Sequence, residues 1–253
     1  MLVLLTNDDG IQAIGLRSLY WALKSQGHEV EVIAPLTEQS AVGHAITMFS
    51  PIRAKSIKEN GFQGIGILGT PVDCVKWALT THFKNGFPDL VISGINNGAN
   101  VGVDVLYSGT VSAATEGALL GLPALAVSID NFTPTRLQRE ATWLVTEFLP
   151  KIDWSKLTKR IVLNLNFPSC GLEASKGLKI CAQTDAVYRD RYEQRFDPRG
   201  RTYYWLTGEI PQEEVKVGTD RDLLSKGYIT LTPLHFRLTN EKLIENNQEW
   251  CKL

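Results

Sequence analysis

Short apolar runs alternate with helical repeats along the first half of the chain. The run from Leu2 to Leu5 is typical of a strand that is buried on both faces. Between Leu16 and Leu23 apolar side chains recur at helical spacing, and Gly27 is placed to end that helix in a left-handed cap. Val30 to Ala34 is a second apolar run, so the stretch predicts a strand–helix–strand unit with parallel strands.

The same alternation continues to about residue 165. Thr70 and Pro71 predict a helix start, because threonine caps well and proline suits the first helical position. Strands are predicted over residues 90–93, 124–129 and 161–165, and helices over 111–120 and 136–149. This succession predicts an α/β fold with a doubly wound, mostly parallel sheet and helices on both faces.

The rhythm changes after about residue 170. Residues from Tyr188 to Glu209 mix aromatics and arginines around an Asp-Pro-Arg-Gly turn, which predicts a long β-hairpin. A final strand is expected over 227–234, and a short helix in the C-terminal residues. We therefore expect one α/β domain over residues 1–253, with a core of about 1–185 and a projecting C-terminal β-hairpin arm and tail over about 186–253. The charges of the arm nearly cancel, which favours a protein interface over a nucleic-acid clamp.

The composition is that of an ordinary globular protein, with 43% hydrophobic and 21% charged residues and a formal net charge of -1. No basic excess is present, so no nucleic-acid polymer is expected as a partner, whereas small anions can still bind to a metal and backbone amides. The cysteines at 74, 170, 181 and 251 lack CxxC spacing, which argues against a disulfide framework or a zinc site and favours a reducing compartment. We expect no signal peptide and no membrane span, and hence a cytoplasmic location.

A glycine pattern at residues 64–69 satisfies the letters of GxGxxG. In a dinucleotide-binding fold the third glycine packs inside the helix, whereas here the glycines all precede Thr70 and Pro71, where the helix begins. The segment therefore predicts a glycine-rich strand. The chain also has no GxxxxGK[ST] phosphate loop and no GxSxG nucleophile elbow.

Two adjacent carboxylates, Asp8 and Asp9, follow the first predicted strand. In open α/β sheets ligands bind at this carboxyl edge of the strands. Adjacent carboxylates repel one another, so a cation is their natural partner. The alternative is an ordinary turn, because Asp-Gly is a turn signal by itself.

Oxygen donors from two other strand ends belong to the same edge. Ser40 follows the second predicted strand and Asn96 follows the strand over 90–93. Together with Asp8 and Asp9 they form an all-oxygen set, which favours Mg²⁺ or Mn²⁺ over Zn²⁺. A lone serine or asparagine in a loop is otherwise a cap or turn residue.

A phosphate site is predicted where Ser108, Gly109 and Thr110 precede a helix. Hydroxyls, free backbone N–H groups and the positive end of the helix all suit an anion there. The alternative is that Thr110 only caps the helix. His44 lies among these loops and is a candidate for proton transfer or phosphate contact, unless it is merely packed; His28, His82 and His235 are expected to be structural or on the surface. The substrate contacts expected in addition, from the same loops, are Gly43 and Asn100.

Long motifs now give the chain a resemblance that short ones could not. It resembles the stationary-phase survival protein SurE family of metal-dependent nucleotide phosphatases, in LLTNDDGIQAIGL, APLTEQSAVGHAIT, GTPVDCV and VISGINNGANVGVDVLYSGTVSAATEGALLGLPALAVS. DPRGRTYYWLTG and GTDRDLLSKGYITLTPL extend the resemblance to nearly the whole chain. One departure is Ile14, where many relatives have proline, beside the aspartate turn.

The resemblance implies one divalent metal ion per subunit, Mg²⁺ or Mn²⁺, on Asp8, Asp9, Ser40 and Asn96. It also implies phosphate contact by the segment from Ser108 to Thr110, a Rossmann-like core, and a C-terminal arm that makes a homodimer or homotetramer. The implied substrates are nucleoside 5′- and 3′-monophosphates, and for some members short polyphosphate.

A mechanism follows as a hypothesis. Asp8 or Asp9 is expected to orient or deprotonate an attacking water while the helix start holds the phosphoryl oxygens. A phospho-aspartate intermediate is the rival, although the DxD spacing usual for that chemistry is absent. Two other functions stay open: a non-catalytic nucleotide-sensing module, and a nucleotide-sugar transferase that binds a metal through diphosphate.

Overall fold

The computed structural model describes residues 1–84, 86–157 and 160–246, and Cys251 lies outside them. Its strands are β1 (Leu2–Thr6), β2 (Glu29–Pro35), β3 (Arg53–Glu59), β4 (Phe62–Leu68), β5 (Leu90–Asn97), β6 (Ala124–Ile129), β7 (Ile161–Phe167), β8 (Leu178–Ile180), β9 (Arg189–Phe196), β10 (Thr202–Glu209) and β11 (Ile229–His235). Its α-helices are α1 (Ile14–Ser25), α2 (Pro71–Trp77), α3 (Gly109–Leu119), α4 (Pro134–Trp143), α5 (Asp220–Ser225) and α6 (Glu241–Asn246).

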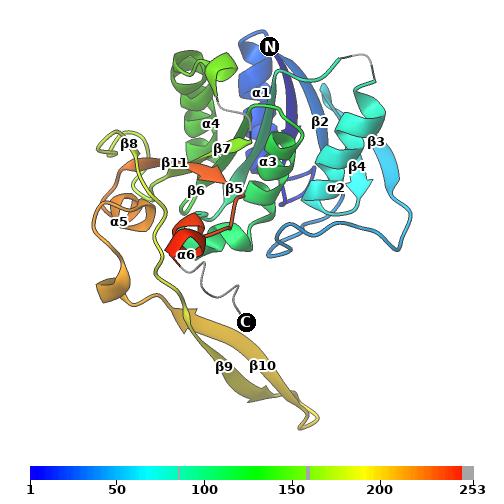
Figure 1. Cartoon of the computed structure of the whole chain (residues 1–253). Coiled ribbons are helices and arrows are strands. Elements are labelled where there is room, and N and C mark those ends of the chain that lie inside the picture. Colours follow the sequence, from blue (N-terminus) through cyan, green and yellow to red (C-terminus); the bar gives the residue numbers. More distant parts are fainter. Residues whose placement is uncertain (85, 158–159, 247–253) are drawn as a thin grey trace.

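A nine-stranded sheet forms the centre of the molecule, in the order β3-β4-β2-β1-β5-β6-β7-β11-β8 (Figure 1). The strands from β4 to β7 in this order are all parallel, whereas β3 and β11 are antiparallel to their neighbours β4 and β7. The apolar sequences of β1 and β6 agree with this arrangement, because strands buried on both faces lack polar alternation. The predicted doubly wound, mostly parallel α/β sheet is confirmed.

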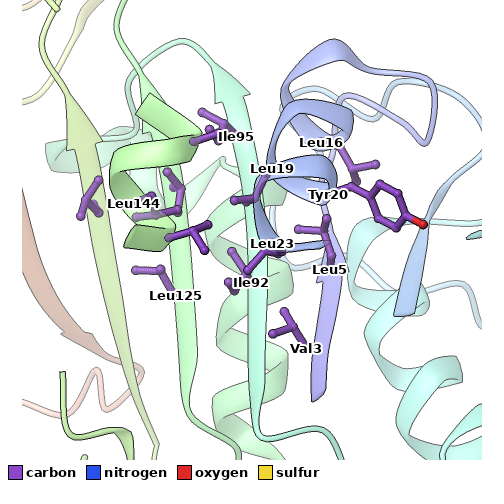
Figure 2. Close-up of a cluster of buried hydrophobic side chains, with 14 of the residues drawn as sticks. Val3, Leu5, Leu16, Leu19, Tyr20, Leu23, Ile92, Ile95, Leu125 and Leu144 are labelled. Carbon is purple, nitrogen blue, oxygen red and sulfur yellow. The ribbon is translucent and has the colours of Figure 1, made fainter. Parts of the chain in front are cut away.

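Helices cover both faces of the sheet, and each face has its own apolar core. On one face α1, α4 and the π-helical turn that continues α4 pack on β1, β5 and β6 through residues such as Leu19, Leu23 and Leu144 (Figure 2). On the other face α2 and α3 contribute Val75 and a series of alanines. The small side chains of α3 let this helix lie close to the strands: a Cβ on Gly117 would come within 2.8 Å of Val91.

The order of the strands places a switch point between β1 and β5. The chain runs outward from β1 through β2, and β5 then returns to the other side of β1. Ligands bind at such a point, outside the carboxyl ends of the two strands. Asp8 and Asp9 follow β1 after Asn7, and Asn96 is the last residue but one of β5, so these three predicted site residues lie at the switch point.

The arm is a separate two-stranded antiparallel ribbon of β9 and β10 that projects from the core (Figure 1). Its turn is held by Asp197, whose Oδ1 accepts the backbone N–H groups of Arg199 and Arg201 at 2.8 and 2.9 Å. The predicted hairpin is confirmed. After the arm the chain returns to the core, where β11 pairs with β7.

Several boundaries differ from the sequence prediction. The edge strand β3 and the helix α5 were not predicted. The helix expected over 136–149 is α4, which continues as a π-helical turn over Leu144–Phe148. The glycine-rich segment is confirmed as strand β4. Thr70 caps α2: its hydroxyl oxygen accepts the N–H of Asp73, and the Asp73 carboxylate accepts the N–H of Thr70. Within the described residues no helix combines the length and apolar character that crossing a membrane requires.

Candidate metal and phosphate site

Asp8 lies buried at the carboxyl end of β1, with 6% of its surface exposed. Its Oδ1 accepts the hydroxyl of Thr110, the second residue of α3. Burial raises the pKa of the Asp8 carboxyl, while the Thr110 hydroxyl and the amides of Thr110 and Gly109 act in the opposite direction. The start of α3 therefore already faces a negative charge.

Asp9 is less buried and less well compensated. Burial and the neighbouring Asp8 carboxylate raise its pKa from 3.8 to about 6, although the backbone N–H of Asn97 donates to its Oδ2 at 3.3 Å. The ion pairs found among the described residues include neither aspartate. Two adjacent carboxyls with no cationic side chain bound to them are a receptor for a cation from solution.

The loop that carries Ser40 reaches this pair through its backbone. The N–H of Gln39 donates to the carbonyl oxygen of Asp8 at 2.8 Å, and Ser40 is the next residue of this loop. The hydroxyl of Ser40 is exposed and donates to Glu38 Oε1 at 2.6 Å. Its lone pairs are thus the part of the hydroxyl that a metal can use.

Asn96 comes from the irregular end of β5. The pairing of β5 with β6 shifts between Ser93 and Asn96, and bulges of this kind re-aim side chains next to active sites. The Nδ2 of Asn96 donates to the carbonyl of Gly98 at 2.7 Å, so the amide oxygen is the atom left to accept or coordinate. Its neighbour Asn97 is the residue that bonds to Asp9.

The start of α3 divides its two hydroxyls between two tasks. Ser108 is the N-cap, and its Oγ accepts the N–H of Val111 at 3.0 Å. Capping therefore belongs to Ser108, and the alternative that Thr110 only caps the helix is wrong, because its hydroxyl bonds to Asp8. Gly109 has no room for a side chain: a Cβ there would come within 2.7 Å of the Asp8 Cβ. Glycine thus lets the helix end approach the carboxylate closely.

His44 is held at the outer side of α3. Its Nε2 lies 2.9 Å from Glu116 Oε2, and the other oxygen of Glu116 accepts Lys76 Nζ at 2.7 Å. The N–H of Gly43 donates to the carbonyl of Tyr107 at 2.9 Å, so the loop rests on the residues that precede the phosphate site. His44 is oriented by a buried carboxylate and still has 38% of its side chain exposed.

Asn100 is built into the scaffold. Its N–H donates to Asn166 Oδ1 and its Nδ2 to Ser128 Oγ, both at 2.8 Å, and its carbonyl accepts the amide groups of Asn164 and Asn166. These contacts fix the loop after β5 to the ends of β6 and β7. A role for Asn100 in substrate contact stays a prediction.

The donor set fits a hard divalent ion. It offers two carboxylates, a hydroxyl and an amide oxygen, and no cluster of three or more His, Cys, Asp or Glu that could hold a metal occurs among the residues described. Mg²⁺ and Mn²⁺ prefer oxygen ligands and bind with few carboxylates, whereas Zn²⁺ prefers nitrogen and sulfur.

Sequence reasoning missed the residues that support the site. Glu116 is a lone acid in a helix of small residues, and this contrast was the available signal. Asn164 and Asn166 interrupt the apolar strand β7 at alternate positions, which places both on the same face. Polar residues inside a buried strand call for partners, and here the partner is the Asn100 loop.

The chain is similar to known proteins along nearly its whole length. The family described as survival protein SurE matches residues 3–190. A protein of Maridesulfovibrio salexigens named 5′-nucleotidase SurE is 57% identical over 244 residues, which cover 96% of each chain. A protein of Solidesulfovibrio magneticus with the same name is 58% identical over 240 residues, covering 95% of this chain and 93% of its own. The crystal structure of the SurE protein from Aquifex aeolicus is 35% identical, covers 99% of both chains and has a TM-score of 0.80.

Proposed function

The chain belongs to the survival protein SurE family, and from that premise we propose that it is a metal-dependent phosphatase that hydrolyses nucleoside 5′-monophosphates to nucleoside and phosphate. Its relatives named 5′-nucleotidase support the reaction class over nearly the full chain. Nucleoside 3′-monophosphates and short polyphosphate extend the proposed substrates. The observation that carries the proposal is the adjacent pair of Asp8, which is buried and bonded to Thr110 at the start of α3, and the partly exposed Asp9.

The metal would be held by the oxygen atoms of Asp8, Asp9, Ser40 and Asn96. When bound, a divalent cation polarises the phosphoryl group and lowers the pKa of a water molecule. Burial raises the pKa of both carboxyls, and the Asp8 charge raises that of Asp9 further, so a bound cation would stabilise their ionised forms.

The start of α3 would bind the phosphoryl oxygens. Ser108 accepts from Val111 and keeps its own hydroxyl proton free to donate, and Gly109 lets the start of α3 lie close to Asp8. Donors fixed before the reaction stabilise charge that gathers in the transition state, because they need no reorganisation. His44 and Gly43, on the loop that rests on Tyr107, would contact the remainder of the substrate.

Of the two aspartates, Asp9 is better suited to orient or deprotonate the attacking water. It is partly exposed, whereas Asp8 is buried and bonded to Thr110. The same contacts of Asp8 favour direct attack by water over a phospho-aspartate intermediate.

We further propose that the arm makes a homodimer or homotetramer. Aromatic and aliphatic side chains of the arm are 40–70% exposed in the single chain: Tyr192, Phe196, Tyr203, Tyr204, Trp205 and Leu206. An isolated hairpin with so much apolar surface is stable only when it is covered, and a second copy of the chain is the expected cover. The free thiols of Cys74, Cys170 and Cys181 suit the proposed cytoplasmic location.

Phosphate release tests the function directly. Purified protein should release phosphate from nucleoside 5′-monophosphates with Mg²⁺ or Mn²⁺ and lose this activity in excess chelator. A nucleotide sensor would bind the same nucleotides with no release under any metal. A nucleotide-sugar transferase would consume diphosphate donors only when a sugar acceptor is present.

A further inference from the structure

The segment that leads into the proposed phosphate site is held by residues from far along the chain. We propose that Asp220 and Arg221 are positioning residues, which fix the turn over residues 101–107 and thereby set the start of α3 against Asp8. The proposal rests on the phosphate site proposed above. It concerns the Gly-Thr-Asp-Arg-Asp motif at 218–222, to which no role has been assigned so far.

Asp220 is fully buried and its carboxylate joins two segments. One oxygen, Oδ2, accepts the N–H of Gly102 at 2.8 Å. The other, Oδ1, accepts the N–H groups of Thr184 at 2.9 Å and Arg221 at 2.8 Å. Burial raises the pKa of this carboxyl, and the amides of Gly102, Thr184 and Arg221 oppose that rise. A buried carboxylate is costly unless it is well bonded, and here every bond goes to the backbone.

Arg221 and Gln183 hold the same turn at three further points. The Nη2 of Arg221 donates to Asp104 Oδ2 at 2.5 Å and to the carbonyl of Val101 at 3.2 Å. The Nε2 of Gln183 donates to the carbonyl of Gly102 at 2.6 Å. The turn is thus held through the N–H of Gly102, the carbonyls of Val101 and Gly102, and the carboxylate of Asp104.

The turn passes this restraint directly to the start of α3. The carbonyl of Asp104 accepts the N–H groups of Tyr107 and Ser108, each at 3.0 Å, and Ser108 is the N-cap. Asp104 therefore connects Arg221, through its side chain, to the cap residue, through its backbone. A shift of this turn would move the first N–H groups of α3 away from Asp8.

Gly102 shows how tightly the turn is fitted. Its φ is +59°, in the region that favours glycine, and a Cβ there would lie 2.5 Å from Thr184 Cγ2. The backbone of Gly102 thus lies directly on the segment at the root of the arm, with the Asp220 carboxylate bonded to both. A donor set for phosphoryl oxygens needs this kind of support, because small displacements cost rate.

The experiment compares Asp220→Asn and Arg221→Met with Asp222→Asn. Asparagine keeps the size of Asp220 but turns an N–H₂ group toward one of the amides, so one contact becomes repulsive. Asp222 is the matched control: it lies in the same helix, and among the described residues its carboxylate bonds to Gly218 and Lys226, both in the same segment. The Arg221→Met variant keeps the Asp220 carboxylate in place and supplies a folded variant if Asp220→Asn does not fold.

Three quantities are measured on each variant: kcat/KM with a nucleoside 5′-monophosphate, the inhibition constant of orthophosphate, and the Kd of Mn²⁺. We expect kcat/KM to fall about 10- to 100-fold and orthophosphate to bind about tenfold more weakly in the two test variants, because the donors are displaced. Mn²⁺ binding should be unchanged in both, since Asp8, Asp9, Ser40 and Asn96 are untouched. The control should match the wild type in all three.

A purely structural role predicts a different result. In that case a folded Arg221→Met or Asp220→Asn protein would melt at a lower temperature but keep its orthophosphate constant, which overturns the proposal. Equal losses of Mn²⁺ and orthophosphate binding would overturn it as well, because the damage would then not be confined to the start of α3. If the wild type releases no phosphate from any nucleotide, the proposed function fails, and calorimetry of orthophosphate binding still decides the positioning role.

Discussion

Replacing Asp9 by asparagine should stabilise the metal-free protein while it removes metal binding. Burial and the Asp8 carboxylate raise the pKa of Asp9 from 3.8 to about 6. The charged form of Asp9 is therefore unfavourable in the folded chain when no cation is present. Asparagine has nearly the same shape, carries no charge, and can still accept the N–H of Asn97 through its oxygen.

The magnitude follows from linkage. The rise in the pKa of Asp9 from 3.8 to about 6 lowers the free energy of unfolding by up to about 3 kcal/mol at pH values where Asp9 is ionised. Partial exposure of Asp9 reduces this, so we expect a gain of about 1–3 kcal/mol for the variant. For a chain of this size each kcal/mol shifts the melting temperature by roughly 2–4 °C.

The sign of the pH dependence is fixed by the same shift. When folding raises the pKa of a carboxyl, the protein loses stability as the pH rises from the pKa of the unfolded state through the pKa of the folded state. The wild type should therefore fall behind Asp9→Asn between about pH 4 and pH 6 and stay behind at higher pH, with no difference below pH 4.

Melting temperatures in excess chelator at pH 4 to 8 measure this difference. Adding Mn²⁺ should raise the melting temperature of the wild type and leave Asp9→Asn unchanged. Asp185→Asn is the control, because Asp185 is an exposed aspartate whose pKa is lowered by Lys216, and its loss should give no gain. A metal-free Asp9→Asn protein that melts at or below the wild type at pH 8 would refute the reasoning.

The remaining predictions concern the helix start, the support of His44 and the arm. Thr110→Ala should lower kcat about tenfold or more in phosphate-release assays, whereas Ser108→Ala should also lower the melting temperature by the equivalent of about 1 kcal/mol, since it removes the cap. Glu116→Gln should destabilise the protein at pH 7 and less so below pH 4, because bonds from His44 and Lys76 overcome burial and lower the pKa of Glu116; an equal loss at both pH values would contradict this. Replacing residues 189–209 by a short turn should give monomers in light scattering, and an arm-less protein that still assembles would exclude the arm as the interface.

The fold was predictable where burial produces an apolar pattern in the sequence. Parallel strands covered on both faces appear as apolar runs, so β1, β2, β5, β6 and β7 could be located. The edge strand β3 was not, because its sequence RAKSIKE is charged and almost wholly exposed. Charges on edge strands protect against unwanted pairing, and they also hide the strand from an apolar pattern.

The candidate site was predictable only for residues that follow the ends of predicted strands. Asp8, Asp9 and Asn96 follow from strand ends, which a single sequence can indicate. The roles of Ser108 and Thr110 could not be separated, because both residue types cap helices and only the position of Asp8 decides between them. Contacts such as Gly102 with Asp220 join residues 118 positions apart, and no local pattern encodes them.

The segments on either side of the arm meet in the core. The N–H of Asp220 donates to the carbonyl of Ala182 at 2.9 Å, and Ala182 and Thr219 form a β-bridge. The chain thus leaves and re-enters the core at neighbouring points, so the exposed ribbon of β9 and β10 forms an insertion whose length the core does not constrain. Such a junction tolerates exchange of the inserted piece. With the arm as the proposed subunit interface, the subunit arrangement can change through replacement of this one ribbon, while the residues around Asp8 stay as they are.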